Sequence, residues 1–241
     1  MNETLKQMVV MANKELPKRD LVKYSWGNVS AIDRTQGIVI IKPVGMPYDD
    51  LTIENISVVD LASNILQGPF KPSVDLPIHM ALYENFPEIN AIVHTHSTYA
   101  TIMAQLKRSI PCFGTTHADY FRGEIPCVRE LLDEEIDGPY EYQTGMAIVE
   151  TLNALNLTST EMSGALSPSH GPFTWGSDVW DAVHKTVVLE EIAKMAWGCL
   201  CVNPQLDKIS VVMQDRHFLR KHGPTAYFTN DDYGHGMVQR K

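Results

Sequence analysis

The stretch Ala91-Ile92-Val93-His94-Thr95-His96 joins an apolar, β-branched run to two histidines that lie two residues apart. The run predicts a buried strand, and alternate residues of a strand point to the same face. His94 and His96 can therefore direct two imidazoles at one metal ion. A third histidine, His170, lies far along the chain in Ser167-Pro168-Ser169-His170-Gly171-Pro172. Three histidine ligands and one open coordination position are typical of a catalytic zinc site. The alternative is that these are ordinary histidines at a strand end with no metal to bind.

Helical and strand patterns flank this segment. Apolar periodicity predicts helices over 3–16, 77–86, 98–106, 144–153, 177–201 and 210–221, and strands over 37–42, 56–60, 89–94 and 164–166. The first two strands should pair antiparallel across a turn, and 112–137 should be a functional loop. This order predicts an α/β fold of α+β character, a single three-layer domain with a central, mostly antiparallel sheet flanked by helices.

Three local signals mark where helices begin and end. Pro17 should end the first helix, because proline disrupts the hydrogen bonding of a helix interior. Ser97 should cap the helix over 98–106, and Ser177 or Asp178 should cap the longest helix.

Composition narrows the class of protein. The chain has 241 residues, of which 44% are hydrophobic, and a formal net charge of −9. This acidity argues against binding to nucleic acids or to anionic membranes. We expect one domain over 1–241 with a C-terminal tail over 224–241, no spanning segment and no signal peptide. Four cysteines without a disulfide or zinc-ribbon spacing fit a reducing compartment, so the cytoplasm is the expected location.

Polar residues outside the histidines supply further candidates. Asp75 precedes a helix and could be an acid/base, an additional metal contact, or simply a helix-start carboxylate. Asp119, in Thr115-Thr116-His117-Ala118-Asp119-Tyr120, could transfer a proton, although a polar loop often uses Asp for capping. A phosphate could be bound by donors from Asn28, Lys42, Gly45 and Ser73, although no P-loop is present. His184, His217 and His222 lie on predicted helices and are not predicted ligands.

Long strings in the sequence resemble the class II aldolase/L-ribulose-5-phosphate 4-epimerase superfamily, and specifically its 4-epimerase branch. The resemblance runs from Leu21 to about Tyr227 and covers nearly the whole chain. The strings that carry it are Leu21-Val22, Trp26-Gly27-Asn28-Val29-Ser30, Ile41-Lys42-Pro43, Ile92 to Ser97, Gly114 to Phe121, Ile125-Pro126-Cys127, His170 to Phe173 and Arg220-Lys221-His222-Gly223.

This resemblance implies a homotetramer of fourfold symmetry with active sites at subunit interfaces, acting on a small sugar phosphate. It implies Zn2+, with Mn2+ or Co2+ as alternatives, on His94, His96 and His170, with Asp75 near the metal. Phosphate contacts map to Gly27, Asn28, Val44, Gly45, Ser73 and Val74, in addition to the Lys42 ammonium. Asp119 matches an acid/base on one face of the substrate.

The implied reaction inverts C4 of L-ribulose 5-phosphate by retro-aldol cleavage and re-formation of the C3–C4 bond, giving D-xylulose 5-phosphate. The family's second acid/base is a C-terminal tyrosine, but Phe228 occupies its column here, so Tyr227 is the predicted substitute and Tyr233 the alternative. Val44 and Val74 replace hydroxyl residues of the phosphate site. The alternatives are an aldolase that cleaves a ketose or ketose phosphate to dihydroxyacetone (phosphate) and an aldehyde, and a non-catalytic metal-binding homologue.

Overall fold

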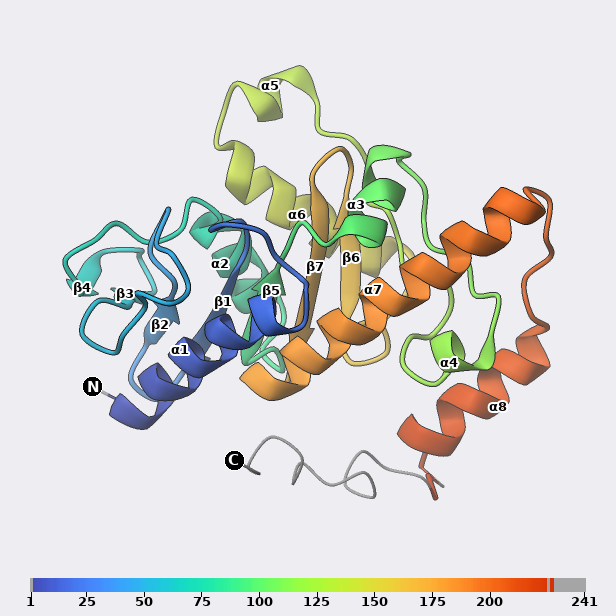
Figure 1. Cartoon of the computed structure of the whole chain (residues 1–241), viewed down its shortest axis with the longest axis horizontal. Helices are drawn as coiled ribbons and strands as arrows, with labels where there is room; N and C mark the ends of the chain where they lie inside the picture. The colour runs from blue at the N-terminus through green and yellow to red at the C-terminus, as the bar shows by residue number, and fades with distance from the viewer. Residues whose placement is uncertain (1, 225, 228–241) are drawn as a thin grey trace.

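A seven-stranded antiparallel sheet forms the centre of the protein in the computed structural model, which describes residues 2–224 and 226–227 (Figure 1). The strand order is β4-β3-β2-β1-β5-β7-β6. The strands are β1 (Asn28–Asp33), β2 (Ile38–Ile41), β3 (Ser57–Asp60), β4 (Ile65–Gln67), β5 (Ala91–His94), β6 (Gly164–Ser167) and β7 (Gly171–Gly176).

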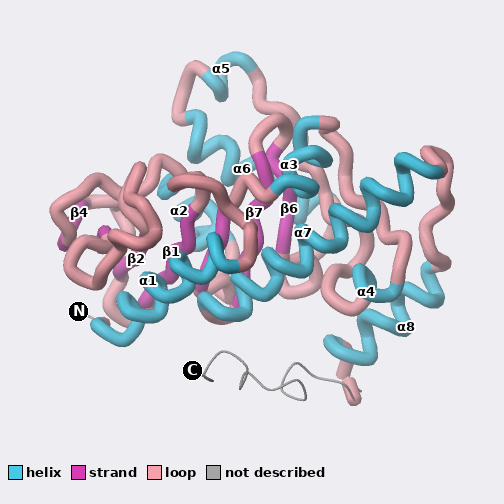
Figure 2. Tube along the Cα trace, in the orientation of Figure 1, coloured by secondary structure: helices cyan, strands magenta, loops and turns pink. Residues whose placement is uncertain are grey.

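Helices surround the sheet and connect its strands (Figure 2). They are α1 (Glu3–Lys18), α2 (Leu76–Asn85), α3 (Thr98–Gln105), α4 (Thr115–Ala118), α5 (Asp133–Ile136), α6 (Tyr140–Ala154), α7 (Val179–Val202) and α8 (Val211–His222). The contact between α4 and α8 places the last helix beside the 112–137 segment. In Figure 1, α8 lies at the far side of the molecule from β4.

Alternation along β2 shows how the sheet divides the core into two layers. Ile38 and Ile40 pack in one apolar cluster with residues of α1 and the first turns of α7. Val39 and Ile41 point the other way, into a cluster with residues of α2 and α6. Because side chains of a strand alternate between its faces, a run of four apolar residues serves both layers. The predicted three-layer architecture is confirmed.

The strand pairing confirms one sequence prediction and adds strands that the patterns did not predict. β2 and β3 pair antiparallel, with Val39 opposite Val59. β1, β4 and β7 were not predicted. β7 lies between β5 and β6 and begins directly after His170.

Several predictions about loops and helix ends were wrong. Segment 112–137 contains the short helices α4 and α5, so it is not loop throughout. Helix α1 continues through Pro17 to Lys18, because proline removes only its own backbone donor and the Arg19 amide that follows still donates to the Glu15 carbonyl oxygen. Ser97 occupies the N-cap of α3 without a side-chain bond, and the Glu190 carboxylate accepts from the Tyr99 and Ala100 amides instead. Asp178 caps α7 as predicted.

Candidate active site

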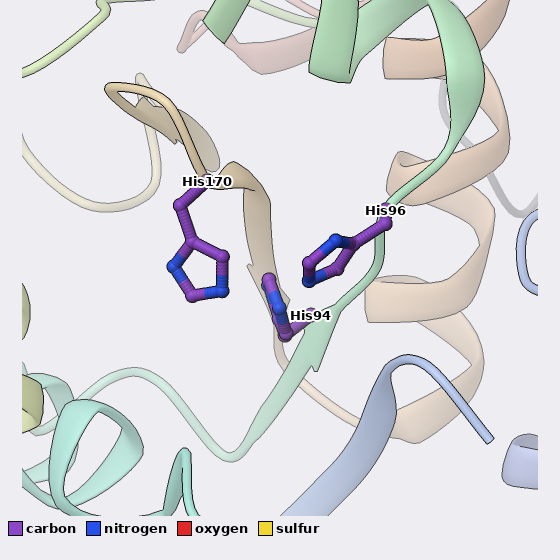
Figure 3. A group of neighbouring side chains, drawn as sticks. All are labelled: His94, His96 and His170. Atoms are coloured by element: carbon purple, nitrogen blue, oxygen red, sulfur yellow. The ribbon is translucent and has the colours of Figure 1, made fainter. Parts of the chain in front are cut away.

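Three histidines converge at one end of the sheet (Figure 3). His94 ends β5, His96 follows it after one residue, and His170 lies in the turn between β6 and β7. Their ring centroids are 4.6–5.1 Å apart, and one nitrogen from each ring lies within 4.8 Å of the others. The predicted histidine cluster is therefore assembled by the fold.

Two glycines allow the backbones of these segments to approach one another closely. β5 and β7 pair so that His94 lies opposite Phe173, which places the β6–β7 turn beside the histidine strand. A Cβ atom on Gly171 would lie 2.6 Å from the Thr95 carbonyl oxygen, and one on Gly27 would lie 2.6 Å from the His94 carbonyl oxygen. Gly27 also has a φ of +102°, which L side chains rarely adopt. Glycine at both positions therefore permits the close approach of three segments.

Hydrogen bonding and burial prepare the imidazoles to bind a metal. The His94 Nδ1–H group donates to the Pro172 carbonyl oxygen at 3.0 Å, so the proton is on Nδ1 and Nε2 keeps its lone pair. Burial lowers the pKa of His94 to about 3 and also lowers the pKa values of His96 and His170. All three rings are therefore neutral near pH 7, as metal binding requires. The residues fit a zinc ion with an open position for substrate.

A cavity of about 560 Å³ opens beside the cluster. Every residue predicted to bind the phosphate lines it, as does Asp75. The full set is Ser25, Trp26, Gly27, Asn28, Lys42, Pro43, Val44, Gly45, Ser73, Val74, Asp75, His94, His96 and His170. An antiparallel bridge between Pro43 and Pro72 joins two of the contributing segments. The cavity thus collects residues from separate parts of the chain.

Asp75 faces this cavity rather than capping its helix. It occupies the N-cap of α2 but makes no side-chain cap hydrogen bond. Its Oδ2 atom instead accepts from Asn28 Nδ2 at 2.7 Å and from Ser73 Oγ at 3.1 Å. Burial raises the pKa of Asp75, but the neighbouring imidazoles and the Ser73 hydroxyl outweigh this and lower it overall. Asp75 is therefore an ionised, oriented carboxylate outside the histidine cluster itself.

Lys42 supplies a positive charge at the wall of the cavity. Its side chain is buried, and Nζ donates to the Ser25 carbonyl oxygen at 3.2 Å and lies 4.9 Å from the centre of the Tyr48 ring. Burial lowers the pKa of Lys42 to about 8, and the charge of Asp75 acts in the opposite direction. The ammonium form therefore still predominates at pH 7 and can attract an anionic group.

Val44 and Val74 line the same cavity with apolar side chains. They are 47% and 60% exposed, respectively. The neighbouring polar side chains Asn28 and Ser73 are bonded to each other and to Asp75. The cavity therefore offers a substrate few uncommitted side-chain donors beside these valines.

The two predicted acid/base residues lie outside this cavity. The described residues that line the cavity include neither Asp119 nor Tyr227. Asp119 follows α4, and its carboxylate accepts from Arg220 at 3.0 and 2.8 Å and from His217 Nδ1 at 3.0 Å. Burial raises the pKa of Asp119, but hydrogen bonds from Arg220 and His217 lower it overall.

Tyr227 is 68% exposed, and its amide donates to the Arg220 carbonyl oxygen at 3.1 Å. Tyr233, the predicted alternative, and Phe228, which occupies the family's tyrosine column, lie outside the described residues. Asp119 and Tyr227 therefore both form hydrogen bonds with Arg220 of α8, although neither residue lines the cavity.

Sequence reasoning missed three residues near the cluster. Trp26 lines the cavity, with its ring centroid 6.3 Å from that of His96. Phe173 stacks on His94, and His79 is fully buried behind Asp75 on α2. Trp26 and Phe173 occur within the strings that carry the family resemblance, so a signal for them was present. His79, four residues after Asp75 on a helix, could have been placed on the same face by helical periodicity.

Comparison with known proteins finds a matching family and several solved structures with a similar fold. Residues 7–197 match the family described as class II aldolase and adducin N-terminal domain. A solved L-fuculose 1-phosphate aldolase is 22% identical, with a TM-score of 0.75 over 90% of this chain and 95% of that one. YgbL from Klebsiella pneumoniae, described as a putative aldolase/epimerase/decarboxylase, is 26% identical, with a TM-score of 0.71 over 90% and 99%.

L-fuculose-1-phosphate aldolase from Thermus thermophilus has the same fold at 21% identity, with a TM-score of 0.66 over 85% of this chain and 98% of that one. Among the described residues, no helix is long and apolar enough to cross a membrane.

Proposed function

Because the chain belongs to the class II aldolase and adducin N-terminal domain family, we propose that it is a zinc-dependent L-ribulose-5-phosphate 4-epimerase acting in the cytoplasm. The reaction would cleave the C3–C4 bond of the ketose by a retro-aldol step and re-form it with inverted configuration at C4. The observation that carries the proposal is the neutral histidine cluster beside a cavity that also contains Asp75 and Lys42.

His94, His96 and His170 would hold the metal, for which Zn2+ is the first choice and Mn2+ or Co2+ could substitute. A bound divalent cation supplies a Lewis acid that stabilises negative charge developing on substrate oxygens. The Pro172 carbonyl fixes the orientation of His94 through Nδ1. Asp75, held by Asn28 and Ser73, adds a negative charge beside the cluster.

The phosphate of the substrate would occupy the part of the cavity lined by Gly27, Asn28, Val44, Gly45, Ser73 and Val74. Gly45 has a φ of +66° and open space where a Cβ would lie, so a ligand oxygen can approach its backbone. The Lys42 ammonium would attract the anionic end. Because Val44 and Val74 offer no hydroxyl donors, binding would depend on the charge of Lys42 and on backbone amides more than on side-chain donors.

Asp119 would be the acid/base on one face of the substrate. Its carboxylate is ionised at neutral pH and can accept the proton of the C4 hydroxyl group, which initiates bond cleavage. Since Asp119 and Tyr227 do not line the cavity of their own chain, a neighbouring copy would have to supply them. This requirement supports a homotetramer with active sites at subunit interfaces.

Tyr227 would be the second acid/base and return a proton to the new C4 oxygen from the opposite face. Its exposed position on the chain would let it reach a partner's cavity. A phenol is a suitable proton donor to an alkoxide, whereas the phenyl ring of Phe228 cannot transfer a proton.

The test is an NMR assay of zinc-loaded protein with L-ribulose 5-phosphate that follows D-xylulose 5-phosphate and free aldehyde together. We expect D-xylulose 5-phosphate without released aldehyde. The Asp119→Asn and Tyr227→Phe variants should lose most of this activity while keeping zinc. Absence of product from zinc-loaded wild-type protein would contradict the proposal.

An aldolase is the second candidate, favoured by the apolar side chains of Val44 and Val74 in the cavity. The same histidine cluster would serve cleavage of a ketose without re-formation of the bond. A coupled alcohol dehydrogenase would report this reaction through the released aldehyde. Aldehyde release at the rate of ketose consumption would select the aldolase over the epimerase.

A further inference from the structure

Tyr48 contacts two parts of the cavity wall, although it is not among the described residues that line the cavity. It is buried in the segment that follows Lys42, and its hydroxyl group donates to the Trp26 carbonyl oxygen at 3.0 Å and to the Gly27 carbonyl oxygen at 2.9 Å. Burial raises the pKa of Tyr48, so the phenol keeps its proton at neutral pH and the two carbonyl oxygens share it. The hydroxyl group of Tyr48 thus holds the backbone just before β1.

The ring of Tyr48 faces the Lys42 ammonium group. Lys42 Nζ lies 4.9 Å from the ring centroid, within the range of a cation–π contact. The same ammonium group donates to the Ser25 carbonyl oxygen at 3.2 Å. Because an ammonium group has three N–H donors, these two contacts leave a donor for a ligand in the cavity that Lys42 lines.

Three consecutive carbonyl groups, those of the loop 25–27, therefore bind to two side chains. Lys42 binds the first carbonyl oxygen, and Tyr48 binds the second and the third. The sheet brings these segments together, because β1 and β2 pair antiparallel with Ser30 opposite Ile41. The residues before β1 then lie beside the residues after β2. The contact between Lys42 and the Tyr48 ring closes this arrangement.

The charge of Lys42 requires compensation at this place. The side chain is buried, and burial of an ammonium group is unfavourable unless neighbouring groups stabilise the charge. Burial lowers the pKa of Lys42 to about 8, and the charge of Asp75 opposes that change. The electron-rich face of the Tyr48 ring supplies a second stabilising contact. An aliphatic side chain at position 48 would fill the space without stabilising the charge.

We propose that Tyr48 is a positioning residue for the anionic group of the substrate. Its ring holds the Lys42 ammonium group at the cavity wall, and its hydroxyl group holds the loop whose Ser25 carbonyl is the other contact of that ammonium group. Tyr48 thus acts through Lys42 and does not touch the substrate. The inference rests on the proposed function only in assigning Lys42 to the anionic end of the ligand. It predicts that phosphate affinity depends on Tyr48 only while Lys42 is present.

Substitutions at positions 42 and 48, singly and together, test this dependence. The affinity of zinc-loaded protein for inorganic phosphate would be measured by calorimetry at neutral pH, with metal-free protein in parallel to identify phosphate that binds the metal. We expect Tyr48→Leu to weaken phosphate binding roughly tenfold, and Tyr48→Phe, which keeps the ring, to weaken it less than about threefold. In a Lys42→Met background, Tyr48→Leu should add little, because the ammonium group that it positions is gone.

Three results would overturn the proposal. They are unchanged phosphate affinity in Tyr48→Leu, equal losses in Tyr48→Leu and Tyr48→Phe, and additive losses in the double variant with Lys42→Met.

Tyr83→Leu is the matched control for the loss of a buried tyrosine. Tyr83 is buried on α2, and the described residues that line the cavity do not include it. Its replacement should lower the melting temperature while leaving phosphate affinity within about threefold of wild type. Equal losses of phosphate affinity in Tyr83→Leu and Tyr48→Leu would show a general effect of stability and contradict the positioning role.

NMR of the wild-type protein tests the contact between Lys42 and Tyr48 without a variant. In lysine-labelled protein, the ring current of Tyr48 should move the ε-CH2 signal of Lys42 upfield of the signals of exposed lysines. Added inorganic phosphate should shift the same signal. A Lys42 signal at the position of the exposed lysines, or one that phosphate leaves unchanged, would reject the inference.

Turnover separates this inference from the proposed function. Phosphate binding and the lysine signal are measured without catalysis, so a protein that meets both expectations but lacks epimerase activity would reject only the proposed function. In an active enzyme, Tyr48→Leu should raise KM for L-ribulose 5-phosphate and change kcat little. An active Tyr48→Leu enzyme with the wild-type KM would reject only the inference.

Discussion

The ring of Phe173 stacks on the ring of His94, with centroids 4.2 Å apart and an angle of 19° between the planes. The two residues lie opposite each other in the β5–β7 pair, so the sheet register creates the contact. Phe173 is fully buried, and its other neighbours include His79 and His170. One aromatic side chain therefore packs against two histidines of the cluster and the buried histidine behind it.

Phe173→Leu should weaken zinc binding by removing the flat surface that orients His94. It should also destabilise the metal-free protein by about 1–2 kcal/mol, since leucine fills the site incompletely. Urea unfolding and chelator competition would measure the two effects separately. A matched Phe121→Leu variant, buried but outside the cavity, should lose stability without losing zinc affinity. Equal zinc affinity in the two variants would contradict the orienting role.

The free energy of unfolding of the metal-free protein should fall as the pH decreases from 6.5 toward 4. Burial lowers the pKa values of His79 and His117 to about 4, so the unfolded chain binds protons that the folded chain excludes. Stability then rises with pH across this window, by up to about 1.4 kcal/mol per pH unit for each such histidine. Urea titrations at several pH values would measure the slope. A free energy of unfolding that stays constant between pH 6.5 and 4 would contradict the prediction.

Val74→Ser should improve binding of a phosphorylated ketose by adding a hydroxyl donor at the cavity wall. A hydrogen bond to a charged group contributes about 1.5 kcal/mol, so KM should fall roughly tenfold. The value of kcat should change little, because the contact is present in both the ground state and the transition state. Val74→Ala, which shortens the side chain without adding a donor, is the control. An equal fall in KM for both variants would show that space, not hydrogen bonding, limits binding.

Arg220→Gln should raise the pKa of Asp119, since the guanidinium group stabilises the charged carboxylate through two hydrogen bonds. If Asp119 is the base, the acidic limb of the kcat/KM profile should move about one pH unit upward. Lys208→Gln, which removes the exposed ion pair with Glu124, should leave that limb in place. An unchanged acidic limb in Arg220→Gln would exclude Asp119 as the group that this limb reports.

Much of the architecture follows from local patterns in the sequence. The apolar run before His94 and the alternating faces of β2 require a sheet covered on both sides. The sequence also pointed to most of the residues that line the cavity, but not to Ser25, Trp26 or Pro43. Strands β1, β4 and β7 were harder to predict. β7 contains two glycines and a proline in Gly171–Gly176, and a strand of this composition forms because β5 and β6 pair with both of its edges.

The sequence by itself pointed to a cluster of residues that could hold a metal ion, because His94 and His96 lie two residues apart after an apolar run and His170 belongs to another string of the family resemblance. Only the tertiary structure decided which groups act on these residues. Asp119 pairs with Arg220 from 101 positions away, and His79 meets Ser30 from 49 positions away. Such contacts depend on how helices dock on the sheet, and periodicity within one segment carries no information about that docking.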